Sequence, residues 1–86
     1  NYTADERMAA FLISLSRRYA ARGFSPTRFV LTMSRTDIAS YLRLAAESVS
    51  RVFRRFQDEG LIRVDRREIG ILGPGLEDLA RNVLRD

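Results

Sequence analysis

Apolar residues recur along this chain with the spacings of helices and of short strands. Between Ala4 and Arg22 they follow the three- and four-residue steps of one helix face, at Met8, Phe11, Leu12, Leu15 and Tyr19. Gly23 is suited to the left-handed turn that ends a helix, and Ser25-Pro26 continues into irregular chain. The pattern predicts a long amphipathic helix over residues 4–22, with its apolar face in the core.

A short strand and a short helix are expected next. Residues 28–33 include β-branched and aromatic side chains, which is typical of a brief strand. Ser34 offers a side-chain oxygen as an N-cap, and Asp37 occupies the capping-box position three residues later. These signals predict a helix over residues 35–42, with three apolar side chains for its inner face: Ile38, Ala39 and Leu42.

A second helix follows after only three residues, Arg43-Leu44-Ala45. It runs from Ala46 until Gly60 ends it. Four of its apolar side chains have the spacing of a buried face: Val49, Val52, Phe53 and Phe56. Two helices joined by so short a turn, with apolar faces able to pack together, predict a helix-turn-helix.

Beyond Gly60, two short apolar runs flank the charged turn Asp65-Arg66-Arg67-Glu68, which predicts a β-hairpin. Gly73-Pro74-Gly75 breaks the chain before a last short helix marked by Leu76, Leu79, Ala80, Val83 and Leu84. The order of these elements predicts an α+β, mostly helical fold. It is a winged helix-turn-helix with a small β-hairpin wing, forming one domain over residues 1–86.

The composition limits the chemistry. The 86 residues are 45% apolar, enough for one packed core, and no apolar run approaches the roughly 20 residues that cross a bilayer. There is no Cys, His or Lys, so an enzyme would have to work with carboxylates, hydroxyls and Arg alone. We therefore expect no catalysis and no metal site. The first residue is Asn1, which favours a piece of a longer protein.

All fifteen basic residues are Arg, against eleven acids, giving a net charge of +4. A basic domain attracts polyanions, although a surplus this small also occurs on proteins that bind none. Arginine is suited to bidentate contacts with guanine and phosphate. The position of the arginines therefore matters more than their number.

The helix predicted over residues 47–59 carries a second, exposed stripe: Glu47, Ser50, Arg51, Arg54 and Asp58. Arg can bond O6 and N7 of guanine, Glu can accept from N4 of cytosine, and Ser can serve either way. The first three members lie in the first two turns, the part of a recognition helix that enters the major groove. The alternative is a solvated face with ion pairs such as Glu47–Arg51. The helix-turn-helix context favours base reading.

Three stretches between about Glu6 and the end of the chain carry a family resemblance: ERMAAFLISLSRRYAARGFSP, LTMSRTDIASYL and ESVSRVFRRFQDEGLI. On these stretches the chain resembles the C-terminal DNA-binding domain of the FNR branch of the CRP/FNR bacterial transcription regulators. The last stretch contains the E-x-x-S-R signature of that branch, here Glu47, Ser50 and Arg51. The resemblance implies that these residues read a TTGAT-type half-site, paired as an inverted repeat. CRP-type members carry Arg immediately before the Glu, where this chain has Ala46.

Two positions depart from the family pattern. Arg43 stands where members often have Gly, so it must tolerate a left-handed backbone if the turn requires one. Ala45 stands where a hydroxyl N-cap is usual, so the start of the second helix lacks a side-chain cap.

Residues that contact phosphate without reading sequence are expected around the reading helix. Ser34, Arg35 and Thr36 begin the first motif helix, Arg54 and Arg55 extend the second, and Arg66 and Arg67 form the hairpin tip. Each has the alternative of a solvated surface position, and one of Arg54 and Arg55 can instead pair with Asp58 or Glu59. The loop with Arg22, Phe24 and Ser25 resembles the region through which the family contacts RNA polymerase, although Phe24 can instead be a packing residue.

The resemblance also implies properties of a full-length protein: a cytoplasmic, nucleoid-associated activator that binds DNA as a homodimer. FNR-type proteins hold a 4Fe-4S cluster with cysteines of an N-terminal domain, so the cluster and the dimerisation helix are expected outside this chain. The chain itself is expected to be monomeric and to hold no cofactor.

The alternative to DNA binding is a winged helix that serves as a protein–protein interaction module. Such a module would more often show apolar anchors on the exposed face of the second motif helix.

Overall fold

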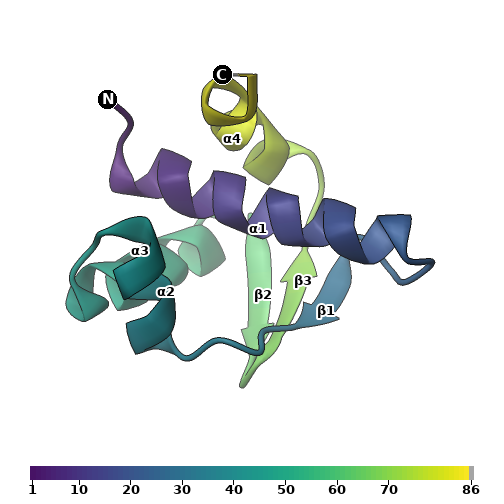
Figure 1. Cartoon of the computed structure of the whole chain (residues 1–86), viewed down its shortest axis with the longest axis horizontal. Helices are drawn as coiled ribbons and strands as arrows, with labels where there is room; N and C mark the ends of the chain where they lie inside the picture. Colours follow the sequence, from purple (N-terminus) through teal and green to yellow (C-terminus); the bar gives the residue numbers. More distant parts are fainter. Residues whose placement is uncertain (86) are drawn as a thin grey trace.

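The computed structural model describes residues 1–85, which form four helices and a three-stranded antiparallel sheet (Figure 1). The elements are α1 (Ala4–Ala21), β1 (Arg28–Val30), α2 (Arg35–Leu42), α3 (Ala46–Asp58), β2 (Ile62–Asp65), β3 (Glu68–Ile71) and α4 (Gly75–Arg85). Their order confirms the predicted arrangement of an α+β winged helix-turn-helix. No helix in this part of the chain is both long enough and apolar enough to cross a membrane.

Local hydrogen bonds set both ends of α1. Thr3 forms a capping box with Glu6: the Thr3 hydroxyl accepts from the Glu6 N–H (3.0 Å), and the Glu6 carboxylate accepts from the Thr3 N–H (2.9 Å). At the other end, Gly23 has a φ of 86°, and this left-handed residue lets the Phe24 N–H donate to the Tyr19 carbonyl (2.8 Å). The predicted turn at Gly23 is confirmed.

Helix α1 lies between α4 on one side and the sheet with α2 and α3 on the other (Figure 1). It is therefore buried on more of its circumference than the single predicted stripe, because Ala9, Ile13 and Ser16 are buried as well. The Ser16 hydroxyl donates to the Pro26 carbonyl (2.5 Å), which satisfies its polar atom in the interior.

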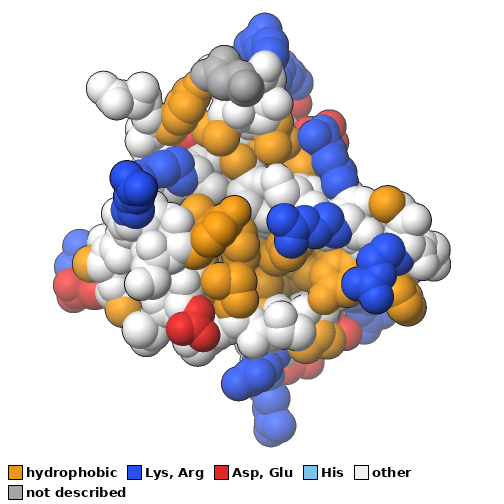
Figure 2. Space-filling model, in the orientation of Figure 1, with side chains coloured by type: hydrophobic (Ala, Val, Ile, Leu, Met, Phe, Trp, Pro, Cys, Tyr) orange, Lys and Arg blue, Asp and Glu red, His pale blue; other side chains and the backbone are white. Residues whose placement is uncertain are grey.

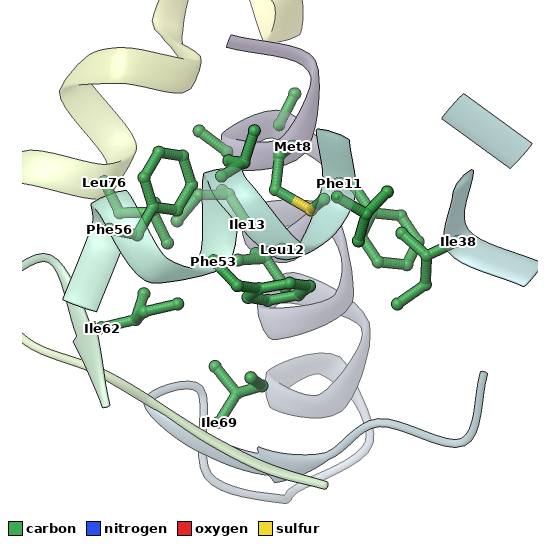
Figure 3. Close-up of a cluster of buried hydrophobic side chains, with 14 of the residues drawn as sticks. Met8, Phe11, Leu12, Ile13, Ile38, Phe53, Phe56, Ile62, Ile69 and Leu76 are labelled. Carbon is green, nitrogen blue, oxygen red and sulfur yellow. The ribbon is translucent and has the colours of Figure 1, made fainter. Parts of the chain in front are cut away.

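The core is built where α3, α1 and the hairpin meet (Figure 3). Phe53 and Phe56 of α3 lie among Met8 and Leu12 of α1, with Ile62, Ile69 and Leu76 nearby. Phe56 and Met8 are 0% exposed, and complete burial of such a side chain contributes about 1.5–3 kcal/mol. This packing fixes which face of α3 points inward and leaves the opposite face to solvent.

The sheet has the strand order β1-β3-β2. β1 is shorter than the predicted strand over residues 28–33, and it pairs with β3 so that the buried Phe29 lies opposite Ile69. Asp65 and Glu68 also pair, so the turn of the hairpin consists of Arg66 and Arg67 alone. The hairpin was predicted from its local sequence pattern. Its pairing with β1 could not be predicted in this way, because the paired residues lie about 40 positions apart in the sequence.

Candidate nucleic-acid interface

The junction between α2 and α3 has the tight geometry that the sequence predicts. Ser34 caps α2 by accepting a hydrogen bond from the Asp37 N–H (3.0 Å). Arg43 adopts a left-handed conformation (φ 59°, ψ 47°), and the Leu44 N–H then donates to the Ala39 carbonyl (2.8 Å). A non-glycine residue in this region costs about 1–2 kcal/mol, so the surrounding contacts must hold the turn in place.

Arg7 of α1 supplies one such contact. Its guanidinium donates to the carbonyl of Leu42 (2.8 Å), in the last turn of α2, where helix carbonyls lack intrahelical partners. A cation there also complements the negative end of the helix dipole. The sequence did not reveal this role, because Arg7 lies 35 residues from its partner.

Helix α3 starts without a side-chain cap, since its N-cap residue is Ala45. Ala45→Ser is therefore expected to raise the free energy of unfolding by about 1 kcal/mol, because the hydroxyl can accept from a free N–H of the first turn. Urea denaturation measures this change. The matched control Ala46→Ser places the same side chain inside the helix and is expected to give no gain. Equal stabilisation by both variants would contradict the capping explanation.

The exposed face of α3 presents the three predicted base-reading residues together. Glu47, Ser50 and Arg51 are exposed, while the four apolar residues of the opposite face are buried. Arg51 and Glu47 form an ion pair (3.2 Å) with side chains 67% and 76% exposed. A pair this exposed contributes only about 0–1 kcal/mol. It agrees with the alternative of a solvated face, and it is weak enough to open when another group competes for either side chain.

The residues at the start of α2 divide into two groups. Ser34 and Thr36 are exposed. Arg35 instead lies over the ring of Phe53, with its Cζ atom 4.2 Å from the ring centroid, and burial lowers the pKa of Arg35 from its usual value. This cation–π contact joins the two motif helices, so Arg35 has a role in the protein that its position in the sequence did not indicate.

Arg54 and Arg55 are neighbours in the sequence but differ in their contacts. Arg54 is exposed and has no ion pair with any residue from 1 to 85. Arg55 makes a bidentate ion pair with Asp5 of α1, in which its Nε donates to Oδ2 (3.2 Å) and a terminal nitrogen donates to Oδ1. Hydrogen bonding to Asp5 raises the pKa of Arg55. The alternative of an ion pair with Asp58 or Glu59 is not realised for Arg55, since its ion-pair partner lies 50 residues away.

The hairpin tip lies close to the segment that leads into α2. The Leu31 N–H donates to the Arg67 carbonyl (2.7 Å), three residues before the Ser34 cap. Arg66 and Arg67 are exposed, and Arg66 has a φ of 57°. This bond holds the hairpin tip, with Arg66 and Arg67, beside the segment that enters the helix-turn-helix.

The loop with Arg22, Phe24 and Ser25 lies at the end of α1 away from α2 and α3 (Figure 1). Phe24 is 59% exposed, and its ring meets the ring of Tyr19 edge-on at 6.2 Å. The Arg22 guanidinium lies 5.8 Å from the Phe24 centroid. Phe24 therefore has both a packing contact and a large exposed surface.

Apolar side chains gather at the centre of one face of the molecule, with arginines around them (Figure 2). An open, mostly apolar groove of about 330 Å³ is lined by residues of α1, α2 and α4 and by Met33. None of these lining residues belongs to α3. Within residues 1–85, no cluster of three or more His, Cys, Asp or Glu is placed to hold a metal ion.

The fold and the candidate interface define a winged helix-turn-helix of the DNA-binding class. Two helices are joined by a tight turn, the second has a polar exposed face, and a hairpin lies beside them. Residues 6–80 match the family model described as the Crp-like helix-turn-helix domain. The chain belongs to this family. It is a DNA-binding domain of a CRP/FNR-type transcription regulator and not an enzyme, as the sequence predicted.

Curated relatives carry the names of transcription regulators. The transcriptional activator protein FnrA of Stutzerimonas stutzeri is 59% identical over 70 residues, covering 81% of this chain and 29% of that protein. The transcriptional regulatory protein btr of Bordetella pertussis is 54% identical over 77 residues, covering 88% and 32%. The fumarate and nitrate reduction regulatory protein of Escherichia coli is 53% identical over 68 residues, covering 79% and 27%. The chain spans about a third of the length of these relatives.

Solved structures show the same fold. FixK2 from Bradyrhizobium japonicum superposes with a TM-score of 0.76 at 37% identity, covering 90% of this chain and 38% of that one. A CRP/FNR-family transcriptional regulator from Thermus thermophilus gives a TM-score of 0.71 at 28% identity, covering 93% and 41%.

Proposed function

We propose that this domain reads a TTGAT-type half-site in the major groove through Glu47, Ser50 and Arg51. The observation that carries the proposal is the division of α3 into two faces: a buried apolar face and an exposed face with these three side chains. Arg51 would bond O6 and N7 of the guanine, the commonest specific contact in the major groove. The Glu47 carboxylate would orient Arg51 or accept from cytosine N4.

Five exposed residues are proposed to contact phosphate: Ser34, Thr36, Arg54, Arg66 and Arg67. The Ser34 hydroxyl already accepts from the Asp37 N–H, but its own O–H remains available to donate to a phosphate oxygen. Arg35 and Arg55, which sequence alone grouped with them, are assigned to contacts inside the protein with Phe53 and Asp5.

The alternative, a protein–protein interaction module, would more often show apolar anchors on the exposed face of α3. Glu47, Ser50, Arg51 and Arg54 occupy that face instead. The apolar groove involves α1, α2 and α4 and leaves α3 free. This distribution favours DNA reading by α3.

We propose that a full-length polypeptide, as long as the curated relatives, is a transcription activator that binds an inverted repeat as a homodimer. It would act in the bacterial cytoplasm, at the nucleoid that holds its target DNA. The Arg22, Phe24 and Ser25 loop would face RNA polymerase, since it lies at the end of α1 away from α3. A 4Fe-4S cluster would need cysteine ligands. This chain has no Cys, so residues outside it would have to hold the cluster.

The proposal is tested by fluorescence anisotropy of the domain with a TTGAT duplex and a scrambled duplex, across a series of salt concentrations. We expect tighter binding to TTGAT and a linear fall of log K with log salt concentration for both duplexes. Equal affinity for the two would contradict specific reading. Affinity that does not change with salt would contradict binding to the DNA backbone.

Arg66→Ala is expected to weaken binding to both duplexes by the same factor and to reduce the salt slope by about 0.9, because one phosphate contact is lost. The same anisotropy titrations measure it. The control is Arg85→Ala, which removes one Arg from the last turn of α4 and should leave both affinities nearly unchanged. A change in the ratio of the two affinities with Arg66→Ala would contradict a phosphate-contacting wing.

A further inference from the structure

The ion pair between Asp5 and Arg55 is the best shielded in the part of the chain that the structure describes. The Asp5 side chain is 30% exposed and that of Arg55 is 47% exposed. In the other described pairs, every side chain is at least 42% exposed. Shielding from water strengthens the attraction between opposite charges, and the bidentate geometry adds to it. We therefore expect this pair to be more populated in solution than the other four described pairs.

Arg55 lies at the edge of the surface proposed to face DNA. It follows Arg54 directly and lies one helical turn after Arg51, with the buried Val52 and Phe56 beside it on the inner face. A free guanidinium at this position would be another cation available to phosphate. The Asp5 carboxylate both neutralises it and holds it towards the first turn of α1.

We propose that Asp5 is a positioning residue that withholds Arg55 from the DNA backbone, so that the domain makes one phosphate contact fewer on this side of the recognition helix. This inference rests on the proposed function. Contacts to phosphate strengthen binding to every sequence alike, whereas base contacts strengthen binding to one. Restraining a cation next to the reading residues therefore lowers the affinity for every sequence by the same factor, so that base contacts supply a larger fraction of the total binding free energy.

The magnitude follows from counterion release. A protein with six to ten phosphate contacts loses about 10³- to 10⁵-fold in affinity between 50 and 200 mM salt, which is about threefold for each contact. Asp5→Asn keeps the size of the side chain but removes its charge. It is expected to free Arg55 and to steepen the salt slope by about 0.9 on the scrambled duplex. Affinity should rise by the same factor for the scrambled and the TTGAT duplex, with a gain about threefold larger at 50 mM than at 200 mM salt, and the ratio of the two affinities should stay the same.

The matched control is Asp78→Asn. It makes the same change of net charge at an acid of α4 that pairs with Arg81, and it should leave the slope unchanged. A second control is the double variant Asp5→Asn/Arg55→Gln, which should return the slope to the wild-type value. Loss of helix stability alone cannot imitate the expected result, because partial unfolding weakens binding and does not steepen its salt dependence. Circular dichroism confirms the fold of each variant.

Two results would overturn the inference. One is a salt slope for Asp5→Asn that equals the salt slope for Asp78→Asn. Failure of both variants to bind DNA counts as the same result. The other is a single Arg55→Gln variant that lowers the wild-type slope as much as Arg54→Gln does, since Arg55 would then already contact phosphate. Failure of the proposed function is distinct: a wild-type domain that binds both duplexes equally would contradict half-site reading, while the comparison of slopes would still decide the role of Asp5.

Discussion

Arg51→Ala is expected to lower the affinity for a TTGAT duplex by about 5- to 150-fold, which corresponds to about 1–3 kcal/mol for a bidentate contact to guanine. The affinity for a scrambled duplex should fall by about threefold at most, because there the side chain offers only its charge. The exposed ion pair with Glu47 (3.2 Å) adds little to stability, so the variant should fold normally. Anisotropy titrations with both duplexes measure the two affinities.

Arg54→Ala is the control for this prediction. It removes the same side chain type from the same exposed face, one turn further along α3. We expect it to weaken binding to both duplexes equally, as a phosphate contact does. If Arg51→Ala also weakened both equally, Arg51 would be a phosphate contact and the assignment of the reading face would be wrong.

Phe56→Ala is expected to lower the free energy of unfolding by about 3–5 kcal/mol. The ring of Phe56 is 0% exposed and lies in the core where α3, α1 and the hairpin meet (Figure 3). Removal of the ring leaves a cavity and deletes the contacts that hold α3 against the core. Since small domains have only about 5–15 kcal/mol of stability in total, urea denaturation should show a large fall in the midpoint.

Phe24→Ala provides the matched control, because this phenylalanine is 59% exposed. Its removal costs the edge-on contact with Tyr19, which is worth about 0.5–1.5 kcal/mol, and the exposed contact with the Arg22 guanidinium. Similar destabilisation by the two variants would show that Phe56 does not lie at the centre of the core.

Features that depend on neighbours in the sequence were predictable. The caps at Ser34 and Gly23 follow from the local residue types, and the structure has both. The left-handed turn at Arg43 and the missing cap at Ala45 were expected from comparison with the family pattern, and the structure has these as well. The buried stripe of α3 and the exposed stripe beside it follow from helical spacing. The exposure of Glu47, Ser50 and Arg51 on one face was predictable for the same reason.

Features that depend on distant residues were not predictable from a single sequence. Arg55 looked like another cation of the DNA-facing surface, because nothing near it shows that Asp5 would lie opposite. Arg35 likewise stacks on Phe53. The burial of Ile13 adds a second buried face to α1, which packs against α4 as well as against α3 and β1. In each case the missing information is the packing of two elements, which helical periodicity does not contain.

The contact between Arg51 and guanine N7 tests the central claim most directly. Wild-type protein and Arg51→Ala are each titrated with a TTGAT duplex and with the same duplex carrying 7-deazaguanine, which lacks the N7 acceptor, at the guanine of the half-site. Half of a bidentate contact is worth about 1 kcal/mol, so wild-type affinity should fall about fivefold. The affinity of Arg51→Ala should not change. An equal fall in both proteins, or no fall in the wild type, would contradict the claim that Arg51 of α3 reads this base.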